Sequence, residues 1–311
     1  MLTTDDLRLI RALAVAPSMA AAARLLDLTP PAVTIRLQRM EQTLKVRLAV
    51  RQSRGITLTE EGQRLHAQAV EILARIENIG AGLLDPGGRL TGSLRIVAPF
   101  GFGRAYIAPL IKPLHSAHPD LEIRLQLSES PVSDAAGADV VIHIGQLKSS
   151  SWVGHLIAPN DRVLCASPQY MRRIHDLQHP SDLPRYDCLC LRENDEDVVR
   201  WRFTPAAGGG KGVAIRVAGV LSSNDGTVIT DWALAGLGIV ERSEWDVAGL
   251  LAAGRLVRVL PDWSLPTAPV MALLPSRTGV SPRQKLFLDA AKQALGLAPW
   301  RTLPKARKGP R

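Results

Sequence analysis

The segment from Ser18 to Glu41 limits the possible folds of this chain more than any other, because it holds the start signals of two short helices in close succession. Ser18 suits the N-cap of the first helix, since its hydroxyl can accept a hydrogen bond from a free N–H of the first turn. The Ala-rich run from Met19 to Leu26 then has high helix propensity. Thr29 is a second N-cap, and the two prolines after it are tolerated in a first turn. The segment therefore predicts two helices joined by a tight turn.

The second predicted helix has two distinct faces. Its apolar residues recur at spacings that put them on one side, which packs into a core. These residues are Val33, Leu37, Met40 and Leu44. The opposite side carries small, hydroxyl and amide side chains, which can approach base edges of DNA while the helix N-terminus favours a phosphate. These are Pro31, Thr34, Ile35 and Gln38. An ordinary helical hairpin is the alternative, because such pairs are common packing units.

The residues that follow predict a β-hairpin. Val46 to Arg51 and Ile56 to Thr59 read as two short strands, and the turn between them contains a glycine. Arg51 and Arg54 lie near its tip, from where a basic wing can reach the DNA backbone or the minor groove. The wing favours a DNA-binding role for the helix pair.

With this wing, residues 7–62 resemble the winged helix-turn-helix of LysR-type transcriptional regulators, through the motifs S-x-x-x-A-A-x-x-L, T-P-P-A-V-T, R-M-E and L-T-E-E-G. The resemblance implies that the prolines, Thr34 and Ile35 contact bases or adjacent phosphates, and that the wing arginines hold the backbone. The family often has a basic or polar residue in place of Ile35, so an apolar contact, for example with a thymine methyl group, is expected here. Arg36 and Arg39 are expected to be phosphate contacts or solvated charges. The full set of predicted DNA-binding residues is Ser18, Thr29, Pro30, Pro31, Thr34, Ile35, Arg36, Gln38, Arg39, Arg51 and Arg54.

The distribution of charge agrees with a polyanionic partner. The chain has 38 basic and 29 acidic residues, a net charge of +9. Residues 1–60 contain nine basic and five acidic side chains, the tail from Ala298 contains five basic and no acidic ones, and the rest is balanced. Double-stranded DNA fits this pattern better than a membrane surface, for which no anchor or basic amphipathic helix is evident. We expect the tail, residues 299–311, to be disordered, and either to add nonspecific phosphate affinity or to be a solubilising end.

Residues 60–84 predict a long helix with the narrow apolar stripe of a heptad repeat. At about 1.5 Å per residue it would be roughly 37 Å long, so we expect it to pair with a second copy; a helix lying on its own domain is the alternative. A dimer with two reading heads predicts a roughly two-fold symmetric DNA site. The predicted dimerisation residues are Leu65, Ala69, Ile72, Ile76, Ile79 and Leu83. The Asp-Pro-Gly-Gly run at 85–88 then predicts a hinge.

Beyond the hinge, strands alternate with helices, which predicts an α/β fold with a largely parallel sheet, arranged as two lobes around a cleft. The predicted strands include 94–98, 121–127, 139–144, 163–166, 213–217, 238–240 and 270–274, and the predicted helices 104–117, 226–235 and 281–295. The LysR resemblance continues here and implies an effector domain similar to periplasmic binding proteins, with chain crossings near 158–162 and 267. We therefore predict a winged helix-turn-helix domain at 1–59, a linker helix and hinge at 60–88, and an effector-binding domain at 89–298. Its lobe one would comprise 89–160 and 267–298, and its lobe two 161–266.

A ligand of an open α/β sheet lies beyond the carboxyl ends of the strands, near helix N-termini. Residues at such positions also match those that line the effector cleft in the LysR family. They are Phe100, Gly101, Phe102, Ser128, Ser130, Gln146, Lys148, Ser223 and Asn224. Lys148 and the helix N-termini favour a small anion, such as a carboxylate. The alternative is structural, because Ser and Asn also cap helices and Phe fills cores.

Other motifs are incomplete. Residues 101–106 follow a strand as a dinucleotide-binding fingerprint would, but a tyrosine replaces its third glycine. The Gly-Gly-Gly-Lys run at 208–211 resembles a phosphate loop, yet its flanking positions are unsuitable, so a flexible hairpin turn is expected. Histidine pairs occur without a further metal ligand, so we predict no metal and no cofactor. These pairs are His115 with His118, and His175 with His179.

Three cysteines, Cys165, Cys188 and Cys190, lie in apolar strands without a CxxC pair. Reduced core thiols are expected, and a redox switch is the alternative. The sequence has no G-x-S-x-G elbow, no apolar run long enough to span a membrane, and an acidic N-terminus unlike a signal peptide. These features predict a cytoplasmic protein that is not an enzyme.

Together, the patterns predict a bacterial transcription regulator whose cleft closes on a small effector and so changes the arrangement of its subunits on DNA. The resemblance implies a homotetramer built as a dimer of dimers. A two-lobed enzyme whose N-terminal module only oligomerises it is the second hypothesis. Such an enzyme would turn over a small anion even without residues 1–60.

Overall fold

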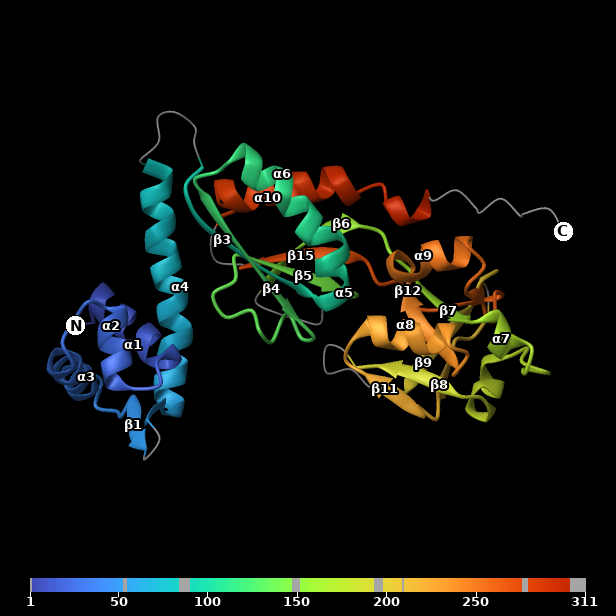
Figure 1. Cartoon of the computed structure of the whole chain (residues 1–311), viewed down its shortest axis with the longest axis horizontal. Coiled ribbons are helices and arrows are strands. Elements are labelled where there is room, and N and C mark those ends of the chain that lie inside the picture. The colour runs from blue at the N-terminus through green and yellow to red at the C-terminus, as the bar shows by residue number, and fades with distance from the viewer. Residues whose placement is uncertain are drawn as a thin grey trace. The chain divides into compact units, whose positions relative to one another are not determined.

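A computed structural model describes residues 2–52, 55–83, 90–146, 152–192, 198–208, 210–275 and 279–302 (Figure 1). The chain forms two compact units, Met1–Gly92 and Ser93–Arg311. Each unit has its own hydrophobic core, and they are described in turn.

The N-terminal unit is a helical bundle with a two-stranded wing. Its elements are α1 (Thr4–Val15), α2 (Met19–Leu25), α3 (Pro30–Leu44), β1 (Ala49–Gln52), β2 (Gly55–Leu58) and α4 (Glu60–Leu83). The predicted N-caps are present: the Ser18 hydroxyl accepts from the Ala21 N–H at 3.2 Å, and the Thr29 hydroxyl from the Ala32 N–H at 3.4 Å. Strands β1 and β2 pair antiparallel, as predicted for the wing. Local start signals therefore set the helix pair where the sequence predicts it.

The core of this unit forms where α3, α1 and α4 meet. Val33 and Met40 of α3 are buried, as their spacing predicts, and pack with apolar residues of α1 such as Ile10. Helix α4 runs beside α1 (Figure 1) and contributes Ala69 and Leu73 to the same core. The core of the N-terminal unit therefore includes α4 as far as Leu73.

This packing corrects the predicted dimerisation stripe. Ala69 is 0% exposed inside the unit's own core, so it has no surface to offer a second copy, and its prediction as a dimer contact is wrong. Leu65 also packs partly against that core. Ile72 and Ile76 are 42% and 40% exposed and stay predicted dimer contacts. The side chains of Ile79 and Leu83 lie outside the described residues. A heptad stripe cannot show which of its turns rests on the chain's own domain.

In the second unit, lobe one is a five-stranded sheet in the order β4-β3-β5-β15-β6. Its elements are β3 (Gly92–Pro99), α5 (Phe100–Phe102), the π-helix η1 (Gly103–Ile107), α6 (Ala108–Ala117), β4 (Leu121–Ser128), β5 (Val140–Ile144), β6 (Trp152–Ala158), β15 (Val270–Pro275) and α10 (Pro282–Leu295). Helices α6 and α10 cover one face of the sheet (Figure 1) and enclose its main core. The lobe-one core therefore joins segments from both ends of the unit.

Lobe two is a second five-stranded sheet, in the order β11-β8-β12-β7-β13, with a small three-stranded sheet, β10-β9-β14, beside it. Its elements are β7 (Arg162–Ala166), α7 (Pro168–Met171), η2 (Pro180–Arg185), β8 (Cys188–Leu191), β9 (Arg200–Pro205), β10 (Val213–Arg216), β11 (Leu221–Ser223), α8 (Gly226–Leu234), β12 (Ile239–Ser243), α9 (Glu244–Ala252), β13 (Val257–Arg258) and β14 (Trp263–Ser264). Strands β9 and β10 pair antiparallel, so the chain reverses between Pro205 and Val213, where the sequence predicts a hairpin turn; Gly209 lies outside the described residues.

Both large sheets are mixed, although the sequence predicts largely parallel ones. Strand β3 runs parallel to β5, but β15 is antiparallel to both β5 and β6. In lobe two, β12 is parallel to β8 and antiparallel to β7. The cause is the double crossing of the chain: β6 leads out of lobe one and its neighbour β15 leads back, so the two run in opposite directions.

The C-terminal segment corrects a second prediction. Residues 299–302 are not disordered: the 3₁₀ turn η3 (Pro299–Arg301) follows α10, and Trp300 is 3% exposed in the lobe-one core. The basic composition suggested a solvated tail, but one tryptophan buries enough apolar surface to hold the turn. Residues 303–311 of the predicted tail lie outside the described residues.

Candidate functional site

The exposed side of α3 carries the residues predicted to read DNA. Pro30 and Pro31 occupy the first turn and are exposed, and Ile35 is 65% exposed on the side opposite the core. Gln38 and Arg39 are also exposed, one turn further along the helix. The hydroxyl of Thr34 donates to the Pro30 carbonyl at 3.0 Å. The helix therefore presents a shallow polar and apolar face beside its positive N-terminal end.

Arg36 of α3 is paired with two acids of the same unit. Its guanidinium lies 3.5 Å from a carboxylate oxygen of Asp5 and 3.5 Å from one of Asp6. Both acids belong to the first turn of α1, where carboxylates also favour the helix dipole. In this structure Arg36 fixes α3 against α1.

Glu41 has a role that the sequence reading missed. Its carboxylate accepts from the Leu48 N–H at 2.8 Å and from the Ala49 N–H at 3.3 Å, and so ties the end of α3 to the start of the wing. Arg51 lies in β1, but its side chain is outside the described residues, and so is Arg54. The position of Glu41, just before the turn from α3 into the wing, is the sequence signal that could have indicated this role. Glu41 therefore sets how the wing is held next to α3.

In the second unit, the residues predicted to line the cleft have different environments. Phe102 is 0% exposed, and its ring lies 4.9 Å from that of Tyr106, so its prediction as a cleft residue is wrong. It fills the lobe-one core, which was the structural alternative. Phe100 and Gly101 are half-buried at the start of α5. A Cβ on Gly101 would lie 3.0 Å from the Trp245 ring, so only a glycine fits this approach without a shift.

The serines after β4 are held within their own loop. Ser128 is buried, donates to the Asp134 carboxylate, and accepts from the Ser130 N–H at 2.9 Å. The Ser128 hydroxyl is therefore engaged in hydrogen bonds within the loop. Ser130 is half-buried. Gln146 is exposed, and Lys148 lies outside the described residues.

Two polar bridges join the lobes near the N-terminus of α8. Asn224 donates to the carboxylate of Glu129, which follows β4. Ser223 accepts from the Asp225 N–H at 3.1 Å and shapes the turn before α8. The predicted residues Ser223 and Asn224 therefore lie on the lobe-two side of this bridge. Glu129, their lobe-one partner, was not predicted from the sequence.

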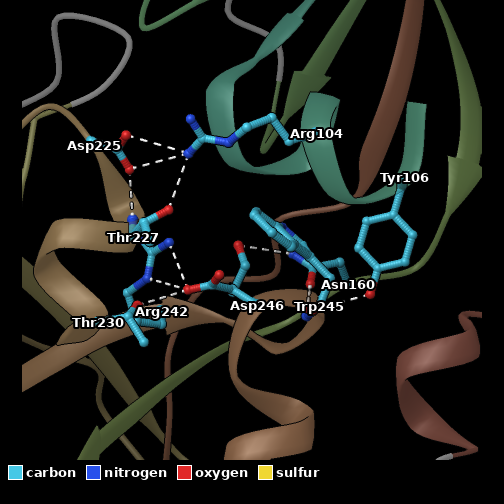
Figure 2. Close-up of polar contacts among 10 residues, drawn as sticks. Arg104, Tyr106, Asn160, Asp225, Thr227, Thr230, Arg242, Trp245 and Asp246 are labelled. Carbon is cyan, nitrogen blue, oxygen red and sulfur yellow. Dashed lines mark hydrogen bonds and ion pairs between the residues drawn. The ribbon is translucent and has the colours of Figure 1, made fainter. Parts of the chain in front are cut away.

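The second bridge is formed by Arg104 of η1, a residue that the sequence reading did not select (Figure 2). Its Nη2 lies 3.3 Å from Oδ2 of Asp225 and 3.1 Å from Oγ1 of Thr227. Burial raises the pKa of the Asp225 carboxyl, but hydrogen bonds from Thr227 and the nearby Arg104 guanidinium together bring it below its ordinary value. A charged carboxylate therefore caps α8 and holds a cation of the other lobe.

A second guanidinium lies on the other side of this turn (Figure 2). Arg242 is buried, and its Nε and Nη2 each lie 2.8 Å from Oδ2 of Asp246. Asp246 also accepts from the Thr230 hydroxyl at 2.9 Å. A Cβ on Gly226 would lie 2.1 Å from Arg242 Nη2, so the guanidinium packs directly on the first residue of α8. The first turn of α8 therefore has arginines on both sides.

The cysteines have the environment of core residues. Cys165, Cys188 and Cys190 are free and buried. Burial raises the pKa of the first two thiols to about 12 and of the third to about 11, so all three are protonated at neutral pH. Within the described ranges, no group of three or more metal-ligating side chains occurs. Among those same residues, no helix is long and apolar enough to cross a membrane.

Comparison with known proteins matches two parts of the chain to two family models. Residues 4–63 match the family described as "Bacterial regulatory helix-turn-helix protein, lysR family", and residues 87–296 match "LysR substrate binding domain". The chain is similar to the HTH-type transcriptional activator TtdR of Escherichia coli K12, at 36% identity over 260 residues, 83% of each chain. It is also similar to the HTH-type transcriptional regulator DmlR of the same strain, at 36% identity over 290 residues, 93% of each chain. Among solved structures, the full-length Vibrio cholerae virulence activator AphB, a member of the LTTR protein family, covers 94% of this chain and 100% of its own, at 25% identity and a TM-score of 0.59.

Proposed function

The chain belongs to the LysR family of transcriptional regulators, and we propose that it reads its DNA site with the exposed face of α3. The observation that carries this proposal is the exposure of Ile35, 65%, on a helix whose other face is fully packed. On this exposed face, the Ile35 side chain can contact a thymine methyl group in the major groove. Thr34 and Gln38, beside it, can hydrogen-bond to base edges or phosphates.

Two substitutions separate base reading from backbone attraction. The probe is double-stranded DNA from the region upstream of the protein's own gene, titrated with full-length protein at several salt concentrations. Ile35→Ala should weaken binding to this probe by about tenfold and leave binding to random DNA unchanged. Arg39→Ala should weaken binding to both and reduce the salt dependence by about one phosphate contact.

The matched control is Arg64→Ala, which removes another exposed arginine of the same unit, one that pairs with Glu60 and Glu61 on α4. It should leave binding to the specific probe nearly unchanged. If all three variants bound both DNAs as the wild type does, the α3 face would not be the reading surface.

We further propose that a small anionic effector binds between the two lobes, near the first turn of α8. Support comes from Arg104 and Arg242, which lie on the two sides of this turn and pair with Asp225 and Asp246, so that an anion can bind by replacing one of these carboxylates. Asn224 and Glu129 add polar groups from both lobes. A ligand in this region would compete with the bridges between the lobes, and so bias their arrangement.

A thermal-shift screen of the full-length protein tests this site. Small carboxylates should raise the melting temperature in proportion to the logarithm of their concentration above Kd, whereas the corresponding amides should not. Arg104→Ala should abolish the shift produced by the best carboxylate, and Arg255→Ala, at an exposed position of lobe two, should keep it. Equal shifts from the amides would exclude an anion-specific site.

We propose that the protein has no catalytic activity of its own. The support is that the two named E. coli relatives are transcriptional regulators. An enzyme that uses its N-terminal unit only for oligomerisation would turn over the best carboxylate of the screen. Turnover that persisted after deletion of residues 1–60 would support that alternative.

Finally, we propose that α4 pairs with its copy in a dimer, which then assembles into a dimer of dimers. The support is the exposed pair Ile72 and Ile76, one turn apart on α4. Ile76→Glu should shift sedimentation towards monomer, whereas Gln68→Glu, which adds the same charge at an exposed position of α4, should not. Unchanged sedimentation of Ile76→Glu would contradict this interface.

A further inference from the structure

The C-terminal turn η3 is built into the lobe-one core. Ala298 adopts φ 48°, a left-handed conformation that turns the chain back after α10. Trp300 then packs edge-on to Tyr106, with ring centroids 5.3 Å apart, and to Phe102 at 6.3 Å. Its indole N–H has no hydrogen-bond partner among the residues that the structure describes, so apolar packing alone keeps it buried. The turn is therefore a fixed part of lobe one.

From this fixed position, Arg301 reaches two acids outside lobe one. Its Nε donates to Oε2 of Glu244 at 2.8 Å, and its Nη2 to Oδ2 of Asp161 at 2.7 Å. Glu244 is the first residue of α9, which follows the lobe-two strand β12. Asp161 lies in the crossing between β6 and β7. One side chain thus holds lobe one, lobe two and the connection between them.

The two chain crossings are themselves hydrogen-bonded at this place. Asn160 donates to the Ala268 carbonyl at 2.8 Å, and the Ala268 N–H donates to the Asn160 carbonyl at 2.9 Å. The Asn160 side chain also accepts from the Trp245 N–H at 3.3 Å (Figure 2). Because both connections and the start of α9 meet here, this is the point about which the lobes can rotate.

Helix α9 transmits any such rotation. Trp245 packs on the lobe-one core, with its ring 5.3 Å from Phe102, and its carbonyl accepts from the Tyr106 hydroxyl at 3.2 Å (Figure 2). Val247, on the other side of the helix, is buried in lobe two. A change in the lobe arrangement must therefore slide the Trp245 face over the aromatic residues of lobe one, or break the bond from Arg301 to Glu244.

We propose that η3 is a brace that locks the hinge between the lobes and sets how readily an effector can rearrange them. This inference rests on the proposed function, in which a ligand between the lobes acts through their arrangement. The brace lies at the hinge, and not among the groups proposed to hold the ligand. Substitutions in it therefore change the ease of lobe movement without removing a ligand contact.

The test measures hinge opening in the full-length protein without any effector. Amide hydrogen exchange, followed by mass spectrometry, compares the wild type with Arg301→Ala. Loss of two charge-assisted bonds should speed exchange at the Glu244 and Trp245 amides by about tenfold, because these N–H groups bond to the crossing at Asp161 and Asn160. Peptides of strand β3 in the lobe-one core should exchange as before. Arg301→Lys should restore part of the protection, since an ammonium can still reach one carboxylate.

A second measurement reports the arrangement of the lobes themselves. Spin labels on cysteines introduced at Ser116 of α6 and Arg202 of β9, both exposed positions, give a distance between the lobes. The three native cysteines are buried, so the label reacts at the introduced ones. Arg301→Ala should broaden the distribution of this distance. The control Lys292→Ala, which removes an exposed cation of α10, should leave it unchanged.

Two results would overturn the proposal. One is a distance distribution in Arg301→Ala as narrow as that of the wild type. The other is faster exchange in β3 as well as at the hinge, which would show that η3 only stabilises the fold as a whole. Both readouts are independent of DNA binding and of any ligand, so their failure is distinguishable from failure of the proposed function.

Discussion

Replacement of Gly62 by alanine is expected to destabilise the N-terminal unit, although alanine is the better helix former. Gly62 lies in the first turn of α4, and a Cβ there would lie 2.0 Å from the carbonyl oxygen of Leu48. That carbonyl is held on both sides, because the Leu48 N–H donates to Glu41 at 2.8 Å and its oxygen accepts from the Thr59 N–H at 3.0 Å. Neither the helix nor the wing can retreat without breaking one of these bonds.

The size of the effect follows from two opposing terms. Alanine gains about 1 kcal/mol over glycine in helix propensity. Overpacking against fixed backbone costs about 1–3 kcal/mol, and loss of the bond from Thr59 to Leu48 adds about 1 kcal/mol. The net change in the free energy of unfolding is therefore a loss of about 1–3 kcal/mol. The matched control is Gly249→Ala in α9, where nothing lies within 4 Å of the new Cβ, and which should gain about 0.5–1 kcal/mol.

Urea unfolding can resolve the two units, because all six tryptophans lie beyond residue 93. Tryptophan fluorescence follows only the second unit, whereas far-ultraviolet circular dichroism follows both. Gly62→Ala should lower the midpoint of the transition seen only by circular dichroism, and Gly249→Ala should raise the fluorescence midpoint. If Gly62→Ala unfolded at or above the wild-type midpoint while the control behaved as expected, the close contact with Leu48 would not constrain this position.

Three further predictions concern single groups. Glu41→Ala leaves two wing N–H groups without their acceptor, so it should cost about 1–3 kcal/mol and weaken DNA binding more than its charge alone explains, measured by unfolding and DNA titration. The pKa of Asp225 is lower in the folded than in the unfolded protein, so its ionised form contributes stability that is present above the unfolded-state pKa and is lost as pH falls through the folded-state pKa. Asp225→Asn should therefore flatten the decrease of Tm with falling pH. An unchanged dependence of Tm on pH would contradict the bridge to Arg104. The buried thiols should react with a disulfide reagent only on unfolding, and fast labelling of the native protein would refute their protonated, inaccessible state.

The DNA-binding unit could be predicted in detail because its signals are local. Ser18 and Thr29 cap helices with bonds that span three residues, and the spacing of Val33 and Met40 alone defines the buried face of α3. Such short-range chemistry is complete within a few turns of sequence. The exposure of Ile35 follows from the same spacing, since it falls on the side opposite the core.

The predictions failed where a residue's environment depends on distant segments. Phe102 follows a strand as a cleft residue would, but partners from α9 and η3 enclose it. Ala69 sits on a heptad stripe, yet α1 covers it. The Arg104 to Asp225 bridge joins residues 121 positions apart, which no local pattern reveals.

Local patterns in the sequence were sufficient to predict the helix pair, the wing, the alternation of strands and helices, and the family. These depend on hydrogen bonds and apolar periodicity within one element or between neighbours. The burial of Ala69 and Leu73, and the polar groups that face one another across the two lobes, became evident only in the folded chain. The burial of the last tryptophan in the lobe-one core is a further example. Burial and ion pairing depend on what lies across the core, and that is set by the folded chain as a whole.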